Sequence, residues 1–567
     1  MKNKILILMA MMTGVMIFAS CEDFLTSTNT TNANQETYFE SDEALETATA
    51  PLYNYVWHSF NDKLYYSMGD GRSNNLTARW SDYIYPFTNF TETSLSPGLE
   101  EAWGSLYSVI AQSNYTINNI KNYSTSAVSE AAKIQAYAEA RFMRGVAYWY
   151  IGSLWGKGII YTDTAAQVAD PVVPPHRQTD VIEFAVRDLE YAAANLSETA
   201  SNPGRVTKHS AYGMLSRVYL SMAGLTTSGA YDGTNIETNF NDGVRNEYYL
   251  DLAKKAALKC IEGPYALMPE YKDLFSVATW NNNSESVFQL QWLTGATDAI
   301  GWGCNNGLSA YFSWSTNVGE TNWGNATYAS WDMVRTYDPA DVKRRHATIA
   351  TVGAEYPELW VALQADGEVY TYNVSEQAGE YENKCNIKKH VLGTNKDNGQ
   401  SYQQSSGVNT YMMRLAEVYL NLAEAILGNN KTTNDAVALE YYNAVRTRAG
   451  MPTKMIIQYE DLHYERRIEL AYEGQYWYDL IRRAYYQQQE VVNYMNAQER
   501  NRGYEWEEAT STYIAAEDPG EGVSVATEQH LLIPISDVDR GRNNLLNGEP
   551  VAYEFGEREV NVTELYN

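Results

Sequence analysis

Cysteine and histidine are scarce in this sequence. The 567-residue chain has 4 cysteines, none in a CxxC pair, and 7 histidines, none in an HExxH motif. After Cys21, the remaining cysteines are Cys260, Cys304 and Cys385. An odd number without close spacing argues against a disulfide framework and a zinc site, and the histidines form no metalloenzyme signature. We therefore expect no metal ion and no cofactor.

Positive charge is also in short supply. The chain has 42 lysines and arginines against 70 aspartates and glutamates, a formal charge of −28. Nucleic-acid binding requires positive charge that displaces counterions, so we expect no nucleic-acid partner. The same charge disfavours anionic polysaccharides, unless a local arginine cluster overrides it.

A long apolar run occurs only at the N-terminus. Two lysines precede a nearly continuous apolar stretch at residues 5–20, which is shorter than the roughly 18 residues or more of a spanning helix and fits a secretory signal. Two small residues then precede Cys21, as in a bacterial lipobox, where the cysteine is acylated and becomes the new N-terminus. An ordinary signal peptide with a chance cysteine is the alternative. We predict that residues 1–20 are a lipoprotein signal and that Cys21 is lipidated.

Removing residues 1–20 would take away two lysines and no acidic residue, so the formal charge would change from −28 to −30. Beyond this segment, the sequence contains no other run that we expect to span a bilayer. The body should therefore be water-soluble and tethered.

Helical periodicity dominates the rest of the chain. Within residues 411–430 the apolar positions repeat at i, i+3, i+4, i+7 and i+11, which places them on one helix face that Gly428 should end. These positions are Leu415, Val418, Tyr419, Leu422 and Ile426. A second helix should follow over residues 435–450. Its expected apolar stripe is Val437, Tyr441 and Val445. Two helices joined by a short polar turn resemble a tetratricopeptide unit.

Three earlier stretches have the same character, at residues 132–156, 207–224 and 249–263. The first is apolar on nearly every side, which predicts a buried helix, and we assign Trp149 and Tyr150 to its core. The predicted fold is mainly α-helical, a tetratricopeptide-like scaffold of helix pairs.

Two loop-rich segments, residues 60–100 and 263–410, interrupt this scaffold. Both are rich in asparagine, glycine and aromatic residues. Rigid helices that hold functional loops are a common way to build a site. Because no long Pro-rich or Gly/Ser-rich linker occurs, we predict one body. Its parts are an N-terminal helical part (21–262), a loop-rich insertion (263–410) and a C-terminal helical part (411–567).

Residues 301–331 concentrate large aromatic rings among residues typical of loops. The stretch holds Trp302, Trp314, Trp323 and Trp331, although the whole chain has only 14 tryptophans. Either this loop is a bent piece of core, or its rings form a ligand platform. A sugar ring stacks its apolar C–H face on such rings, while its hydroxyl rim bonds Asp, Asn and Arg. Trp331 lies at an expected helix start, and we assign it to core.

An ordered series of motifs resembles the SusD/RagB family, surface lipoproteins that Bacteroidetes pair with a TonB-dependent transporter. Gln475, Tyr476 and Ser536 depart from the family pattern, away from any expected ligand site. The motifs are CEDFL (21–25), EARFMRGVAYWYIGSLWG (139–156), GRVTKHSAYGMLSRVYLSMAG (204–224), RLAEVYLNLAEA (414–425), NAVRTRAGMP (443–452), ERRIELAYEGQYWYDLIRR (465–483) and LLIPISDVDRGRNNLL (531–546).

This resemblance implies a non-catalytic, glycan-binding lipoprotein on the cell-surface side of the outer membrane, anchored at Cys21. It would capture a neutral oligo- or polysaccharide and deliver it to a SusC-like TonB-dependent transporter. Glycan contacts in the family come from such loops. We therefore expect Asp70 and Arg72 to bond the hydroxyl rim and Trp80 to stack on a sugar. The candidate platform is Trp302, Tyr311, Trp314 and Trp323.

Two other functions stay open at this point. A helix-pair scaffold also suits a peptide-binding member of the same family, although tryptophan-rich loops with asparagine favour sugars. A glycoside hydrolase would need two carboxylates at a set separation across a cleft, and the sequence shows no local signature of such a pair.

The acidic residues of the 465–483 motif are expected to be structural. Arg466 with Glu469 and Asp479 with Arg483 have the spacing of facing pairs on a helix. Their charges alternate with apolar residues, which is typical of packed helices. We therefore expect no catalytic part for Glu465, Glu469 or Glu473.

Overall fold

The computed structural model describes residues 39–78, 81–237, 243–295, 303–323, 327–374, 384–400, 404–517 and 520–567. Its N-terminal part is helical. The helices there are α3 (Asp42–Thr49), α4 (His58–Phe60), α5 (Tyr85–Thr88), α6 (Leu99–Tyr123), α7 (Glu130–Trp155), α8 (Thr164–Ala169), α9 (Gln178–Asn195), α10 (Lys208–Leu225) and α11 (Glu247–Ile261).

The helices in the described residues of the middle part are short and lie among loops, and the C-terminal part is helical again. The middle helices are α12 (Leu308–Phe312), α13 (Trp331–Thr336), α14 (Val342–Thr348) and α15 (Asn395–Asn398). The C-terminal helices are α16 (Leu415–Leu427), α17 (Ala436–Arg448), α18 (Tyr459–Glu469), α19 (Tyr476–Ala484), α20 (Gln488–Asn496), α21 (Asp537–Arg542) and α22 (Val562–Leu565).

Every strand of the described chain belongs to a two-stranded antiparallel ribbon. The pairs are β1 (Leu76–Thr77) with β5 (Tyr328–Ala329), β2 (Lys157–Gly158) with β3 (His176–Arg177), β4 (Ser286–Leu290) with β6 (Thr410–Arg414), β7 (Thr432–Thr433) with β8 (Ile457–Gln458), and β9 (Tyr504–Glu507) with β10 (Thr512–Ala515). The first pair joins the two aromatic, loop-rich segments, although they are far apart in sequence.

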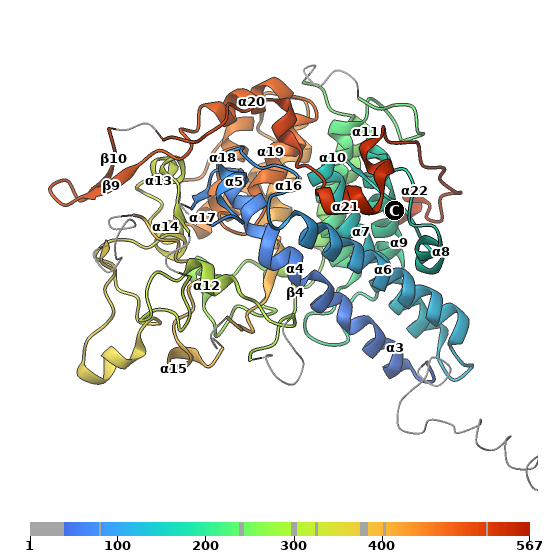
Figure 1. The fold of residues 1–567 in the computed structure, drawn as a ribbon, viewed down its shortest axis with the longest axis horizontal. Helices are drawn as coiled ribbons and strands as arrows, with labels where there is room; N and C mark the ends of the chain where they lie inside the picture. Colours follow the sequence, from blue (N-terminus) through green and yellow to red (C-terminus); the bar gives the residue numbers. More distant parts are fainter. Residues whose placement is uncertain are drawn as a thin grey trace, which may run out of the picture.

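The long helices pack in chain order. Helix α6 packs on α7, α7 on α9, α9 on α10, α10 on α11, α11 on α16 and α16 on α17. Figure 1 shows this stack beside the loop-rich middle part, which lies at the lower left around α12 and α15. The predicted scaffold of helix pairs is therefore confirmed. In the described part of the chain, no helix is long and apolar enough to cross a membrane.

Local signals define the buried helix α7. Ser129 caps its N-terminus, with Oγ accepting a hydrogen bond from the Ala132 N–H at 3.2 Å, and Gly156 ends it with φ of 67°. Trp149 is 1 % exposed and its Nε1 donates to Ser221 Oγ at 3.2 Å. The assignment of Trp149 to the core is confirmed.

The helix pair α16–α17 forms as predicted, but the buried face of α17 differs by one position. Val437 is 37 % exposed, whereas Ala438, Tyr442 and Val445 pack against α16. Both stripes share Val445, so periodicity could not separate them. Contact with alanine and leucine side chains of α16 selects the stripe that starts at Ala438.

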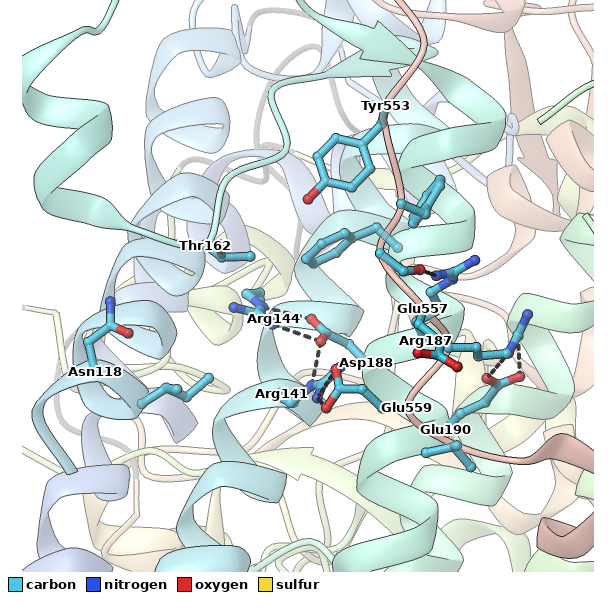
Figure 2. A pocket seen from close by; sticks show the side chains of 16 residues that line it. Asn118, Arg141, Arg144, Thr162, Arg187, Asp188, Glu190, Tyr553, Glu557 and Glu559 are labelled. Atoms are coloured by element: carbon cyan, nitrogen blue, oxygen red, sulfur yellow. Dashed lines mark hydrogen bonds and ion pairs between the residues drawn. The ribbon is translucent and has the colours of Figure 1, made fainter. Parts of the chain in front are cut away.

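The C-terminal segment closes over α7 and α9 by charge pairing (Figure 2). It borders a cavity of about 340 Å³. There Arg141 bonds Asp188 at 2.8 Å and Glu559 at 2.9 Å, and Arg558 bonds Glu190 at 2.7 Å. Because these opposite charges neutralise one another, the cavity offers little net charge to a ligand. We infer that its charged residues hold the C-terminal segment against α7 and α9.

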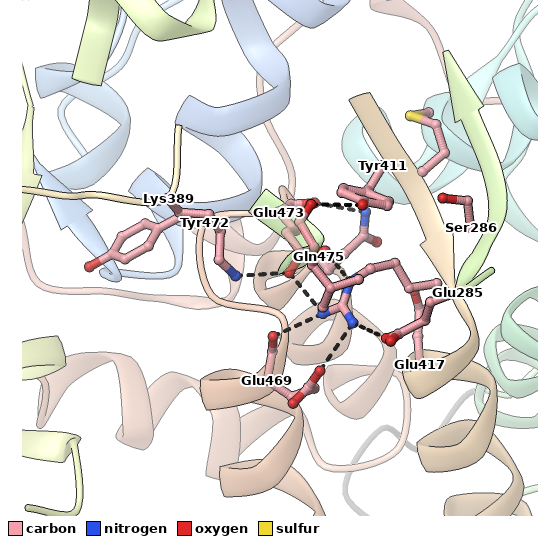
Figure 3. A network of polar contacts seen from close by, with 12 residues as sticks. Glu285, Ser286, Lys389, Tyr411, Glu417, Glu469, Tyr472, Glu473 and Gln475 are labelled. Atoms are coloured by element: carbon pink, nitrogen blue, oxygen red, sulfur yellow. Dashed lines mark hydrogen bonds and ion pairs between the residues drawn. The ribbon is translucent and has the colours of Figure 1, made fainter. Parts of the chain in front are cut away.

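A second ion network lies fully inside the protein, where β6 meets α18 (Figure 3). Arg414 at the end of β6 pairs with Glu285 at 2.5 Å, Glu469 at 3.0 Å and Glu473 at 2.6 Å. Its side chain and those of Glu285 and Glu469 have no exposed surface. Lys389 also pairs with Glu473, at 2.9 Å. Figure 3 shows Glu285, Glu469 and Glu473 turned toward one centre.

Further cations and carboxylates complete this network, which we call the Arg414 network. Its cations are Arg344, Lys389, Arg414, Arg446 and Arg448, and its carboxylates are Glu285, Asp341, Glu465, Glu469 and Glu473. The numbers of positive and negative groups are equal. Glu465, Glu469 and Glu473, for which we expect no catalytic part, are each held by a cation.

The expected pairing within the 465–483 motif is wrong. Arg466 bonds Asp479 at 2.8 Å, not Glu469, and Arg483 bonds Glu460 at 3.0 Å, not Asp479. Arg466 of α18 reaches Asp479 of α19 and Arg483 of α19 reaches Glu460 of α18, so these pairs join the two helices. Asp479 also pairs one turn away, with Arg482 at 3.2 Å. These charged residues still have the structural role that the sequence predicts, but with other partners than expected.

Replacing Arg414 with methionine should lower the free energy of unfolding by about 3–5 kcal/mol, because buried carboxylates would lose their counterion. Equilibrium urea unfolding of the chain from residue 22 onward, followed by tryptophan fluorescence, measures this change. Met matches the apolar stem of Arg, so the loss reports on charge more than on volume.

Arg542→Met is the matched control for this experiment. Arg542 is 66 % exposed and pairs with Glu100, itself 40 % exposed, at 2.9 Å. Surface pairs contribute about 0–1 kcal/mol, so this variant should unfold near wild type. Equal losses for both variants would contradict the structural importance of the Arg414 network.

Candidate ligand-binding surface

Asp70, predicted as a ligand contact, is fully buried within η4 (Ser67–Arg72). Its carboxylate accepts hydrogen bonds from the N–H groups of Tyr472 and Gly474, each at 2.7 Å, and from Asn75 Nδ2 at 2.9 Å. Burial raises the pKa of Asp70 to about 6, against the lowering effect of these bonds. The prediction is corrected, because this carboxylate fastens one loop to the turn after α18.

Arg72 is also fully buried. It pairs with the Glu92 carboxylate at 2.7 Å and donates from Nη2 to the His530 carbonyl at 2.7 Å. Its guanidinium lies 5.1 Å from the ring centre of Phe90 and 5.0 Å from that of Trp477. Such cation–π contacts suit an interior arginine. The expected contact of Arg72 with a sugar rim is therefore corrected as well.

Trp314 belongs to the core of the middle part. It is 4 % exposed, and its Nε1 donates to the Tyr370 hydroxyl at 3.1 Å. The rings of Trp314 and Tyr372 meet edge to face, with centroids 5.3 Å apart. A ring enclosed in this way has no free face for a sugar, so its place in the predicted platform is corrected.

Trp331 begins α13 as expected, but it lies at the margin of the core. Its ring packs against the core while remaining partly exposed, and its Nε1 donates to Glu499 Oε2 at 3.1 Å. The indole is thus anchored by the helix that it starts and by one surface carboxylate.

Trp323 and Tyr311 form an aromatic pair at the surface of the middle part. Tyr311 is 3 % exposed, whereas Trp323 is only partly buried. The two rings meet edge to face with centroids 4.1 Å apart, and Tyr66 lies behind Tyr311 at 4.6 Å. Tyr311 therefore supports the ring of Trp323, and Trp323 keeps surface available for a ligand.

Polar groups from the first loop-rich segment border this aromatic pair. Lys63 Nζ lies 2.7 Å from Asp62 Oδ2 and 4.6 Å above the ring centre of Tyr83. The Lys63 side chain is 24 % exposed. Burial would lower the pKa of Lys63, but Asp62 raises it above its ordinary value, helped by Tyr311 and Tyr83. These electrostatic contacts place all four groups in one neighbourhood.

Asp62 retains an oxygen without a partner in the described protein. Its Oδ1 is buried and accepts no hydrogen bond there, and it lies so near Gly307 that a Cβ atom on that glycine would be 3.0 Å away. Burial of Tyr311, followed by the charge of Asp62, raises the pKa of Tyr311 to about 12. At neutral pH Tyr311 thus keeps its hydroxyl proton. We call Asp62, Lys63, Tyr83, Tyr311 and Trp323 the Trp323 surface.

Sequence reasoning missed Asp62, Lys63 and Tyr83. For Asp62 and Lys63 the signal was present in the stretch NDKLYY at residues 61–66, where a charged pair stands beside aromatic rings. Trp80 and Trp302, the other predicted platform residues, lie outside the described residues, and their part stays a prediction. Two of their sequence neighbours are described: Tyr83 belongs to the Trp323 surface, and Gly303 packs against Tyr55, which is 60 % exposed.

Two family models match this chain. The model described as "SusD family" matches residues 276–550, and the model described as "Starch-binding associating with outer membrane" matches residues 23–220. Together they include all five residues of the Trp323 surface.

Curated relatives match over most of their length. A SusD-like protein of Bacteroides ovatus is 35 % identical over 98 % of this chain and 99 % of its own. The starch-binding protein SusD of Bacteroides thetaiotaomicron is 23 % identical over 74 % of this chain and 73 % of its own.

Solved structures agree with these matches. A structure with a xylogluco-oligosaccharide is 35 % identical, covers 91 % of this chain and 100 % of its own, and has a TM-score of 0.79. A laminarin-binding SusD-like protein, 18 % identical with a TM-score of 0.63 over 89 % of this chain and 98 % of its own, shares the fold. By its two family models and its full-length relative, the chain belongs to the SusD family.

Proposed function

We propose that this protein is a non-catalytic lipoprotein of the outer-membrane surface, lipidated at Cys21. It captures a neutral oligo- or polysaccharide through the Trp323 surface and passes it to a SusC-like TonB-dependent transporter. The relatives support the glycan part of this proposal, since one solved structure at 35 % identity holds a xylogluco-oligosaccharide.

The observation that carries the proposal is the chemistry of the Trp323 surface. A partly exposed indole is supported by a buried tyrosine, and in the same neighbourhood stand the ammonium group of Lys63, which pairs with Asp62, and the phenol of Tyr83. A sugar ring offers an apolar face for the indole and hydroxyl groups for the polar border. Trp80 and Trp302 are expected to extend the platform.

A hydrolytic function finds less support. Glycoside hydrolysis requires one carboxylic acid and one free carboxylate that flank a bond. Glu465, Glu469 and Glu473 are each bonded to buried cations. On the Trp323 surface, Asp62 is the only carboxylate among the described residues, which is one group too few for this chemistry.

Trp323→Ala should weaken glycan binding by about thirtyfold or more, because a hot-spot ring contributes roughly 2 kcal/mol or more. Its melting temperature should stay near wild type. Isothermal titration calorimetry with xyloglucan, laminarin, starch and a uronate-containing polysaccharide measures the affinity. We expect the same loss for Trp80→Ala and for Trp302→Ala.

Three tryptophans serve as controls for this experiment. Trp506→Ala removes a partly buried ring of the β9–β10 hairpin, which packs on Tyr513, and should leave binding unchanged. Trp149→Ala and Trp314→Ala should lower the melting temperature, because core substitutions of this kind cost roughly 3–5 kcal/mol. Normal binding by Trp323→Ala would refute the proposed site, and release of reducing ends by the purified protein would refute the non-catalytic assignment.

Cys21→Ala should release the protein from the membrane without unfolding it. Two or more acyl chains give stable attachment where one is marginal, and the substitution removes the residue that would carry them. Fractionation of cells followed by immunoblotting measures the distribution. Recovery of the variant in the membrane fraction at the wild-type level would contradict lipidation at this cysteine.

The transporter partner can be tested by isolating the tagged protein from native membranes in mild detergent. We expect it to bring down a TonB-dependent barrel protein, identified by mass spectrometry. A tagged outer-membrane lipoprotein of another family is the control. Isolation of the protein alone in several detergents would count against delivery to a transporter.

A further inference from the structure

A second hollow in the middle part has the chemistry of a sugar site. It has a volume of about 290 Å³, near the lower end of small-molecule pockets, which suits one or two sugar units. It lies between the loop after Trp314, the start of η6 (Val361–Asp366) and α15. Its lining residues are Thr316, Asn317, Glu320, Trp360, Ala362, Thr394, Lys396 and Asp397.

Trp360 stands in this hollow with an unusual backbone. Its φ and ψ are both 54°, in the left-handed region that bulky residues rarely adopt. Such strain persists only where the surroundings enforce it, and it gathers at functional sites. A glycine or asparagine would adopt this turn more easily, so the turn alone does not explain an indole there.

One carboxylate, that of Asp397, holds the backbone of Trp360 in this conformation. Asp397 accepts hydrogen bonds from the N–H groups of Val361 at 2.7 Å, Trp360 at 3.3 Å and Thr394 at 2.5 Å. Tyr370 packs beside the indole, with centroids 6.1 Å apart. The ring is therefore fixed in place while it stays partly exposed.

The polar groups of the hollow complement a hydroxylated ligand. Thr316 and Lys396 are exposed and Asn317 is partly exposed, so a hydroxyl, an ammonium and an amide surround one aromatic face. An indole face with several neutral or singly charged hydrogen-bonding groups suits a sugar ring. Asp397 is occupied by backbone groups, and Glu320 Oε1 accepts a hydrogen bond from the Asn395 N–H at 3.1 Å. We expect Asn317, Thr316 and Lys396 to be the polar contacts of a ligand.

We propose that the Trp360 hollow is a second saccharide subsite, distinct from the Trp323 surface, that takes one or two sugar units. The proposal rests on the proposed function, since it assumes a glycan ligand. Both sites border the same hydrophobic core, because Tyr311 and Tyr370 belong to it and Trp323 and Trp360 pack against it. A long glycan that reaches both sites gains affinity through effective concentration.

The direct test is fluorine NMR of the protein labelled with 5-fluorotryptophan. The resonance missing from Trp360→Asn identifies Trp360, and the resonance missing from Trp323→Ala identifies Trp323. Xylogluco-oligosaccharide is then titrated into the Trp323→Ala protein. We expect the Trp360 resonance to shift and the Trp506 resonance to stay, which would support the subsite.

Failure of this proposal is distinguishable from failure of the proposed function. If the Trp323 resonance of the wild-type protein shifts with the oligosaccharide and the Trp360 resonance stays, the subsite is refuted and the glycan function stands. If neither resonance moves with xylogluco-oligosaccharide, laminarin oligosaccharide or maltoheptaose, both proposals are refuted.

Binding of a long polymer gives the second readout. Trp360→Asn should weaken binding of xyloglucan polysaccharide about threefold to tenfold, and Trp506→Ala should not change it. Asparagine and histidine tolerate the left-handed region, so Trp360→Asn and Trp360→His should melt at or above the wild-type temperature. Trp360→His keeps a smaller ring and should retain part of the affinity. Unchanged affinity in both Trp360 variants would overturn the subsite.

Discussion

The Arg414 network is the constraint on which the rest of the structure depends. Taking charges out of water is costly, so a buried network is tolerable only when every group is paired. Burial alone would raise the pKa of Glu469, but Arg448 and Arg414 lower it to about 2. The residues come from β6, α14, α17, α18 and the loops around them. Only the folded arrangement of the middle and C-terminal parts satisfies all of these charges together.

The same strand that ends in Arg414 positions the proposed ligand surface. Thr410 Oγ1 donates to Asn61 Oδ1 at 2.7 Å, and the Val408 carbonyl, just before β6, accepts from Asn306 Nδ2 at 3.0 Å. Asn61 directly precedes Asp62 and Lys63, while Asn306 lies five positions before Tyr311. Hydrogen bonds therefore connect both loops of the Trp323 surface to the β6 segment, and buried ion pairs of Arg414 hold the end of that strand. This anchoring allows two irregular loops to hold a defined geometry.

The sequence predicted the scaffold well because helices arise from local signals, such as caps and periodic apolar faces. It predicted loop burial poorly. Asp70 and its partner Tyr472 are 402 positions apart, and Arg72 bonds the distant His530 carbonyl. No local pattern reveals such contacts, so the sequence suggested that both residues are exposed in a loop and available to a ligand. Trp314 was misplaced for the same reason, while Trp323 stays a prediction that its partial exposure supports.

The aromatic rings of the middle part fall into two groups, those enclosed in the core and those at its margin. Enclosed rings such as Trp314 replace the regular core that loops cannot build, and rings at the margin, such as Trp323, keep a face for solvent. Charge then selects among ligands. Within the described Trp323 surface Lys63 is the only cation, and Asp62 already neutralises it at 2.7 Å. An anionic polymer would meet a chain of formal charge −28 without a free cation there to offset the repulsion. A neutral glycan pays no such cost, so the electrostatics of this surface favour uncharged sugars.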